Sequence, residues 1–182
     1  MISELQPIAA SHRIRLREST PGDIEYVLAA EADPDNAAYI IRWSRDEHLD
    51  AMADADRGHW ILEDRAGESV LGYVILSALT SPHGSVEFNR ITVTDKGLGY
   101  GRECLRLVRG IVFEKFGAHR LWLDVMTHNR RAYGLYKSEG FTEEGCLRDA
   151  LLIDGRRVSL VVLAMLRHEY QNLIGKWAES EG

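Results

Sequence analysis

The chain has 182 residues, of which 45% are hydrophobic and 27% are charged, and its formal net charge is −6. This is the composition of a soluble globular protein with one real core, and the length is too short for two ordinary domains. The acidic balance argues against sequence-independent binding of nucleic acid, and no apolar run approaches the length of a membrane span. The N-terminus also lacks the basic and then apolar pattern of a secretion signal. We therefore expect one domain over residues 1–182, a cytoplasmic location, and neither a nucleic-acid nor a membrane partner.

The first third of the chain predicts an edge strand and two helices. Charged and aliphatic residues alternate over His12–Glu18, which is the period of a strand. Proline suits the first turn of a helix, so a helix is expected over Pro21–Glu31. A capping-box pattern at the start of residues 44–53 predicts a second helix there, after a loop at residues 33–36.

The rest of the chain predicts strands alternating with helices. Strands are expected over residues 59–63, 69–79, 85–94 and 121–125, and helices over residues 103–116, 129–139 and, at the end of the chain, 168–178. Asp154-Gly155 is a strong hairpin signal, and it joins expected strands at residues 141–153 and 157–165. We expect a mixed α/β fold with its core at about residues 13–170.

A glycine-rich turn, Lys96–Arg102, lies between the strand at 85–94 and the helix after it. Glycines let a backbone approach a ligand closely, and the unpaired amides at a helix start, beside the positive end of the helix dipole, can hold a phosphate. No Gly-Lys-Ser/Thr follows, so the turn is not a P-loop. A dinucleotide fold would place such a turn after its first strand, so a nucleotide-binding oxidoreductase is a weak alternative. The second alternative is that the turn is a flexible loop that binds no ligand.

A second motif occupies Asn129–Phe141, where Asn129, Ala132, Leu135, Tyr136, Gly140 and Phe141 follow the spacing Asn-x-x-Ala-x-x-Leu-Tyr-x-x-x-Gly-Phe. Together with the glycine turn, this motif resembles the acetyl-CoA site of the GNAT N-acetyltransferase family, in the branch of ribosomal-protein and polyamine acetyltransferases. The resemblance implies a GNAT fold: a mixed, mostly antiparallel sheet, splayed between the strands that end at Val93 and Val125 and flanked by helices. Acetyl-CoA would be the acetyl donor.

The resemblance also assigns cofactor contacts. The amides from Leu98 to Arg102, which include Gly99, Tyr100 and Gly101, would hold the pyrophosphate of CoA. Lys96 stands where the family usually has Arg or Gln, which keeps a cation and loses the planar guanidinium. The backbone of Ile91 and Val93 would bind the pantetheine arm like an added strand, because its two amides imitate a peptide. Asn129 would line the same slot.

The chemistry of transfer from a thioester to an amine suggests further roles. The departing thiolate needs a proton, which a tyrosine can donate. Taken alone, Tyr136 fits a packing residue better, but together with the glycine turn it is expected to be the general acid. A strand amide near Ile91 to Val93 would bind the oxyanion. Glu87 is the candidate general base, with a water chain and a plain solvated carboxylate as open alternatives. Strand alternation places Glu87 on one face with Ile91 and Val93, unless a β-bulge breaks the register.

The acceptor is less determined by the sequence. We expect a primary amine on a small molecule or a protein N-terminus, attacked directly in a ternary complex. Trp43 and Trp60 lie in segments where the family builds its acceptor pocket, although core packing explains each singly. Cysteines and histidines show no metal-ligand spacing, so no metal is expected. A non-catalytic acyl-CoA sensor is the alternative function, and the terminal helix packs either on the sheet or on a second subunit of a homodimer.

Overall fold

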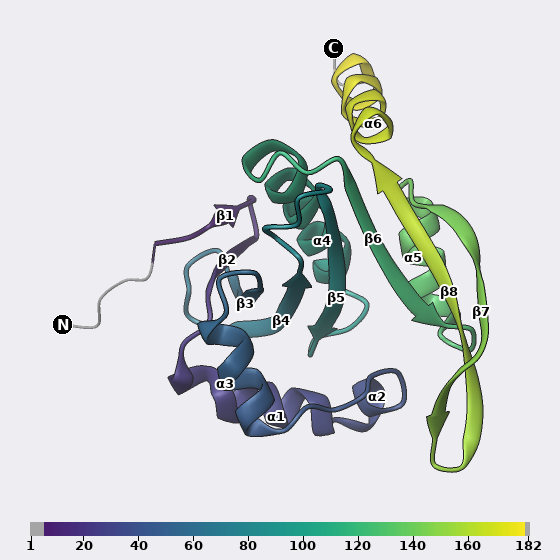
Figure 1. The fold of residues 1–182 in the computed structure, drawn as a ribbon. Coiled ribbons are helices and arrows are strands. Elements are labelled where there is room, and N and C mark those ends of the chain that lie inside the picture. The colour runs from purple at the N-terminus through teal and green to yellow at the C-terminus, as the bar shows by residue number, and fades with distance from the viewer. Residues whose placement is uncertain (1–5, 181–182) are drawn as a thin grey trace.

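One curved sheet of eight strands organises the computed structural model, which describes the backbone of residues 6–180 and the side chains of residues 6–176 (Figure 1). The strands are β1 (Ala9–Ala10), β2 (Ile14–Glu18), β3 (Gly58–Asp64), β4 (Val70–Ser77), β5 (Ser85–Val93), β6 (Arg120–Met126), β7 (Thr142–Ile153) and β8 (Arg156–Leu166). The helices are η1 (Pro21–Asp23), α1 (Ile24–Ala32), α2 (Pro34–Ala37), α3 (Arg45–Ala53), α4 (Tyr100–Gly110), η2 (Ile111–Lys115), α5 (Arg130–Ser138) and α6 (Arg167–Ser180).

The strand order is β1-β2-β3-β4-β5-β6-β8-β7, and every pair is antiparallel except β5 with β6. That parallel pair is short, because only Ser85–Glu87 of β5 lies in register with Arg120–Trp122 of β6. Beyond this point the two strands diverge, as Figure 1 shows. The predicted mixed, mostly antiparallel and centrally splayed sheet is confirmed.

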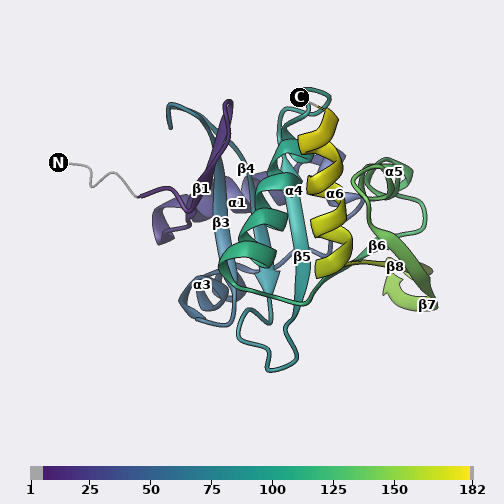
Figure 2. The ribbon, with the colours of Figure 1, turned by 90° about the horizontal axis from the view of Figure 1, so that it is seen from above.

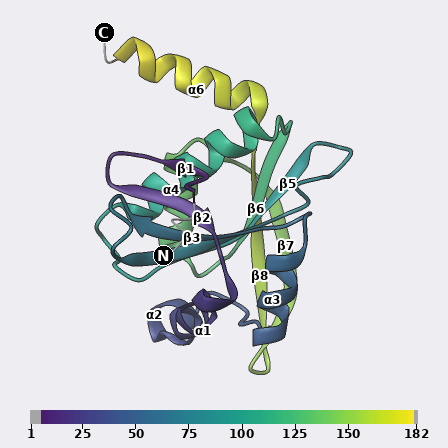
Figure 3. The same cartoon turned by 90° about the vertical axis from the view of Figure 1, so that its left-hand side faces the viewer.

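Helices cover both faces of the sheet. Figure 3 shows α4 on one face of the strands β2–β4, and α1 with α2 on the other. The larger core lies under α4 and includes Phe88, Leu105 and Val108, whereas Val27 and Tyr73 belong to a smaller core under α1. None of the helices in the described part of the chain combines the length and apolarity needed to cross a bilayer.

The terminal helix α6 is anchored mainly by its first turns and then extends away from the sheet (Figures 1 and 2). The Tyr170 ring stacks on Phe113 with 4.9 Å between centroids, and its hydroxyl donates to Glu114. Leu173 packs against the larger core. Within the described chain, the helix therefore covers the end of η2, which agrees with the sheet-packing alternative for its first half.

A β-bulge interrupts β5 beside β4. Ile75 pairs with Arg90 while the next residue, Leu76, pairs with Phe88, so Asn89 is the extra residue. Because a bulge shifts the alternation by one, Phe88 points to the core under α4 and Arg90 to the opposite face. The expectation that Glu87 shares a face with Ile91 and Val93 is therefore wrong.

Two boundaries also differ from the prediction. The expected loop at residues 33–36 contains the short helix α2, because Pro34 opens it and the Asp33 side chain accepts a 2.8 Å hydrogen bond from the Asp35 amide. Helix α4 begins at Tyr100 rather than at Glu103, so the last residues of the predicted turn form its first turn. The helix at residues 44–53 is confirmed as α3, with the capping box formed by Ser44.

Candidate active site

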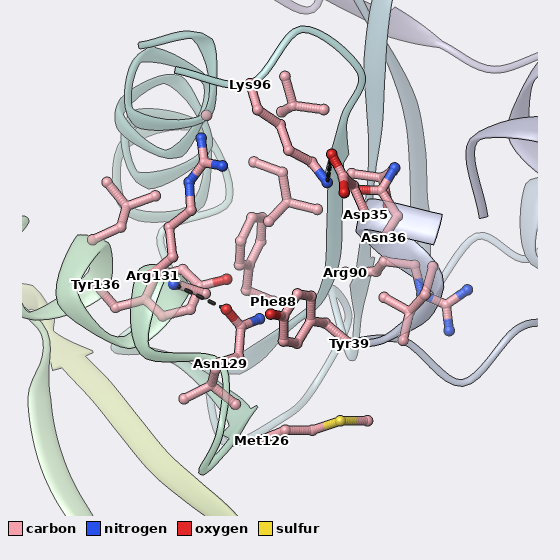
Figure 4. A pocket seen from close by; sticks show the side chains of 18 of the residues that line it. Asp35, Asn36, Tyr39, Phe88, Arg90, Lys96, Met126, Asn129, Arg131 and Tyr136 are labelled. Carbon is pink, nitrogen blue, oxygen red and sulfur yellow. Dashed lines mark hydrogen bonds and ion pairs between the residues drawn. The ribbon is translucent and has the colours of Figure 1, made fainter. Parts of the chain in front are cut away.

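A cleft of about 1020 Å³ opens where β5 and β6 part. Its walls come from β5, β6, the glycine turn, the start of α4, the helix α5 and the segment from Asp35 to Trp43. Figure 4 shows side chains from all these directions pointing into one space. The cleft therefore unites the two motifs that the sequence analysis singled out.

The glycine turn presents the start of α4 to this cleft. Gly97 and Gly99 both have φ of +87°, a conformation that strains any residue with a Cβ, and Gly99 is the N-cap of α4. Among the described residues, no side chain caps the helix start, so the first amides of the helix, at Tyr100, Gly101 and Arg102, have no partner within the helix. Tyr100, Gly101 and Arg102 line the cleft, whereas the Leu98 side chain lies outside it and is 57% exposed. This arrangement suits an anion such as a diphosphate.

Arg13 of the segment before β2 holds the turn in place, a contact that the sequence analysis missed. Its guanidinium donates 3.0 Å to the Leu98 carbonyl and 2.8 Å to the Glu103 carboxylate, and it lies 5.1 Å from the centre of the Tyr100 ring. Glu103 is in the first turn of α4, so one arginine ties the glycine turn to the helix that follows it.

Three cations lie at this end of the cleft: Lys96, Arg102 and Arg131. Lys96 Nζ lies 3.9 Å from the Asp35 carboxylate, on the opposite wall, and Arg102 Nη1 lies 2.5 Å from the buried carboxylate of Glu139. In Figure 4 the side chain of Arg131 extends toward α4. The three cations thus lie near the unpaired helix amides, and two of them are paired with carboxylates.

The edge of β5 beyond Glu87 has no strand partner on the β6 side within the described chain. Ile91 and Val93 lie on this stretch, both line the cleft, and both pair through their other edge with β4. An extended chain that carries amides could add to this edge as a strand would. The geometry is the one that the predicted pantetheine contact requires.

Asn129 and Tyr136 reach the cleft from α5, but in different ways. Asn129 precedes the helix as its N-cap, and its side-chain oxygen accepts a 3.1 Å hydrogen bond from the Ala132 amide. Tyr136 is 7% exposed, and its hydroxyl points into the cleft in Figure 4 without a hydrogen bond to another described residue. Burial, with a smaller contribution from the charge of Asp124, raises the pKa of Tyr136 above its usual value. The phenol therefore keeps its proton.

Glu87 and Asp124 supply negative charge where the two strands separate. Both line the cleft, and Asp124 was missed by the sequence analysis. Burial and then the charge of Asp124 raise the pKa of Glu87. Asp124 is reached by solvent, yet the surrounding walls desolvate it enough to raise its pKa as well. A signal was present in the sequence: Asp124 is the one charged residue in the apolar run Leu121–Met126.

The remaining wall belongs to residues 38–43, between α2 and α3. Tyr39, Ile41 and Trp43 line the cleft, whereas Trp60 lies in the main core and is 1% exposed. Of the two tryptophans expected near an acceptor pocket, only Trp43 is placed there. No cluster of three metal-ligating side chains occurs among the residues that the structure describes.

Comparisons with known proteins agree with this geometry. Residues 13–142 match the model of the acetyltransferase (GNAT) domain. The chain is 30% identical over 114 residues to the spermidine N(1)-acetyltransferase of Vibrio cholerae, which covers 62% of the chain and 65% of that enzyme. It is 24% identical over 172 residues to the spermidine N(1)-acetyltransferase of Escherichia coli K12, which covers 88% of the chain and 90% of that enzyme.

A solved structure of the Vibrio cholerae spermidine N-acetyltransferase in complex with CoA and spermine has the same fold. Its TM-score is 0.79 at 24% identity, over 88% of this chain and 99% of that one. At this identity the likeness concerns the fold, and the family assignment comes from the match of residues 13–142. The chain belongs to the GNAT acetyltransferase family, as its glycine turn and its Asn129–Phe141 motif predicted.

Proposed function

We propose that this chain transfers the acetyl group of acetyl-CoA to a primary amine of a polyamine, by direct attack of the amine on the thioester. Family membership confirms the general reaction, acetyl transfer from acetyl-CoA to an amine. Beyond this reaction, we propose the class of the acceptor and the roles of the residues. The observation that carries it is the cleft with a cationic end at the glycine turn and the Glu87–Asp124 pair at the strand divergence.

The donor is assigned to the cationic end of the cleft. The amides of Gly99, Tyr100, Gly101 and Arg102, with that of Leu98, bind the diphosphate, and Lys96 adds charge. Ile91 and Val93 bind the pantetheine arm along the free edge of β5, and Asn129 borders the same slot. The acetyl group then lies between the strands, within reach of Tyr136.

The acceptor is assigned to the anionic end. A polyamine is a polycation, and two carboxylates whose pKa values are raised gain from a nearby ammonium group. The spermidine acetyltransferases of Vibrio cholerae and Escherichia coli act on such a molecule, which supports this acceptor class over a protein N-terminus.

In the reaction, one proton must be removed from the acceptor amine and one must be supplied to the leaving thiolate. We assign the base to the Glu87–Asp124 pair rather than to Glu87 alone, because two interacting carboxylates titrate together. The deprotonated nitrogen forms its bond to the carbonyl carbon, an amide on the free edge of β5 binds the oxyanion, and the C–S bond breaks. The sulfur takes the proton of Tyr136, which the buried phenol retains until then.

A panel of amines tests the acceptor. Thiol release from acetyl-CoA is measured with spermidine, spermine, an N-terminal peptide and an amino sugar, and the products are identified by mass. We expect kcat/KM for a polyamine to exceed that for the peptide at least tenfold. A preference for the peptide would overturn the polyamine assignment, and tight CoA binding with no turnover on any amine would favour the acyl-CoA sensor.

We also propose that the chain acts as an oligomer, with the predicted homodimer as its smallest form. A solved spermidine N-acetyltransferase of Vibrio cholerae is a dodecamer, and the outer edge of β7 has no strand partner within the described chain. Light scattering on a sizing column measures the mass, and a monomer at every concentration would contradict this. The cytoplasmic location and the single domain over residues 1–182 stay predictions from the sequence.

A further inference from the structure

A buried ionic group centred on Glu31 lies on the face of the sheet opposite α4. Glu31 of α1 is 1% exposed and Arg90 of β5 is 8% exposed, and the two form an ion pair. The same carboxylate accepts a 2.5 Å hydrogen bond from the Tyr73 hydroxyl, and His48 Nε2 lies 3.2 Å from it. These partners lower the pKa of Glu31 to about 2, although burial alone would raise it. The carboxylate is thus charged and held in one position.

Both members of this pair also hold the backbone of residues 38–43. Arg90 Nη2 donates 2.6 Å to the Ile41 carbonyl, and the Trp43 amide donates 3.0 Å to Glu31. The Arg90 guanidinium lies 4.7 Å from the centre of the Trp43 ring. The chain is therefore fixed on both sides of Arg42, which is itself exposed.

This segment is the wall of the cleft that faces α5. At the start of this segment the attachment is exposed: His128 Nε2 lies 3.3 Å from the Ala38 carbonyl, and the centroids of the His128 and Tyr39 rings are 5.6 Å apart. Exposed contacts of this kind contribute little, because water competes for them. The buried Arg90–Glu31 pair is the stronger anchor of the wall.

The bulge at Asn89 makes this anchor possible. It shifts the alternation of every residue after Asn89, so Arg90 faces α1 while Ile91 and Val93 pack against the core under α4. One strand thus carries the predicted donor contacts and, through Arg90, fixes the opposite wall. A change at Arg90 should reach the acceptor side without altering the glycine turn.

We propose that Arg90 and Glu31 are positioning residues for the acceptor, which act by fixing the wall at residues 38–43 against the cleft. This inference rests on the proposed function for its choice of substrate. Neither residue is assigned to the chemistry: each acts through Ile41 and Trp43, so its loss should weaken acceptor binding and leave the thioester chemistry intact.

The test is Arg90→Lys, which keeps the charge opposite Glu31 and removes the planar group that also reaches the Ile41 carbonyl. We expect the KM for spermidine to rise about tenfold, with kcat and the dissociation constant for CoA changed less than twofold. Trypsin cleavage after Arg42, followed by mass spectrometry, should accelerate, because the loop backbone is released.

Arg17→Lys is the matched control. Arg17 is another buried arginine, 9% exposed, and it pairs with Asp23 and Glu63 outside the cleft. We expect this variant to lose a similar amount of stability without a change in the KM for spermidine or in cleavage after Arg42. If both variants alter KM equally, the effect is general destabilisation and the proposal fails.

A double variant provides a second test in case Arg90→Lys folds poorly. Arg90→Met with Glu31→Gln removes both buried charges together, which avoids an unpaired charge in the interior. Recovered thermal stability with a KM for spermidine that stays high supports the proposal, and a KM that returns to the wild-type value overturns it. If the wild type acetylates no amine, the proposed function fails, and cleavage after Arg42 alone decides whether the pair holds the wall.

Discussion

The carboxylate of Glu87 on β5 and that of Asp124 on β6 face one cleft from two strands that no longer pair, and the charge of Asp124 raises the pKa of Glu87 beyond the effect of burial. Two such anions disfavour each other in the folded protein. An ammonium group bound between them relieves both the repulsion and the desolvation. Their unfavourable placement is therefore the physical basis on which we propose that a cation binds at this end of the cleft.

Asp124→Asn should lower kcat/KM for spermidine about a hundredfold or more, the usual contribution of a positioned proton acceptor. It should also raise the melting temperature. Because the folded pKa of Asp124 lies above its unfolded value, the folded state loses stability as the pH rises through that interval, and at neutral pH the full penalty is present. The asparagine removes it. Steady-state kinetics and thermal unfolding at pH 7 measure the two effects.

Glu68→Gln, in the exposed turn between β3 and β4, is the control and should change neither quantity. An Asp124→Asn variant with unchanged kcat/KM would remove Asp124 from the proposed base and leave Glu87 or water in that role. A variant with lower stability would contradict the desolvation argument.

Tyr136→Phe should lower kcat by about a hundredfold, at the low end of general acid catalysis, because the departing thiolate loses its proton donor. The dissociation constant for CoA should change less than twofold, since the ring stays and packs near Phe141, with 6.0 Å between centroids. Steady-state assays measure kcat, and titration with CoA measures its dissociation constant. Equal kcat in wild type and variant would show that solvent protonates the thiolate.

The local elements could be predicted because their causes are local. The glycines before α4, the capping box of Ser44 and the Asp154-Gly155 turn each fix the backbone over a few residues, so the sequence alone identifies them. The position of Tyr136 followed from the motif around it. Of these features, the glycine turn and the segment that carries Tyr136 line the donor side of the cleft.

The acceptor side depends on tertiary contacts, so much less of it could be predicted. The bulge at Asn89 results from pairing with β4, and it decides that Arg90 faces Glu31 instead of the core under α4. The sequence marks Asp124 as a lone charge in an apolar run, but only the divergence of β6 from β5 places it in the cleft. Arg13 contacts the carbonyl of Leu98, which is 85 positions later in the chain, and no local pattern reports such a contact.

Gly99→Ala should weaken CoA binding at least tenfold. An alanine at φ of +87° costs about 1–2 kcal/mol, and the turn can relieve the strain only by moving the amides at the start of α4. Gly175→Ala in α6 is the control, because a Cβ there meets nothing within 4 Å and helix propensity gains up to about 1 kcal/mol. Calorimetric titration with CoA measures binding. An unchanged affinity of Gly99→Ala for CoA would show that the glycine turn does not bind the diphosphate.

The pH dependence of stability should depend on His59, whose side chain is 2% exposed and hydrogen-bonded to His48 and Ser19. Burial, more than the charges of His48 and Arg90, lowers the pKa of His59 from 6.5 to about 4. The unfolded chain therefore binds a proton that the folded chain does not between these values. The resulting stability is fully present above pH 6.5 and is lost as the pH falls toward 4.

The loss over that interval should be on the order of 3 kcal/mol, from 1.36 kcal/mol for each pKa unit. His59→Gln cannot titrate, so its free energy of unfolding, measured in urea at a series of pH values, should fall less steeply between pH 6.5 and 4 than that of the wild type. His83→Gln, at an exposed turn, should keep the wild-type slope. Parallel curves for wild type and His59→Gln would mean that His59 is protonated in the folded protein, and that its buried neighbours accommodate the charge.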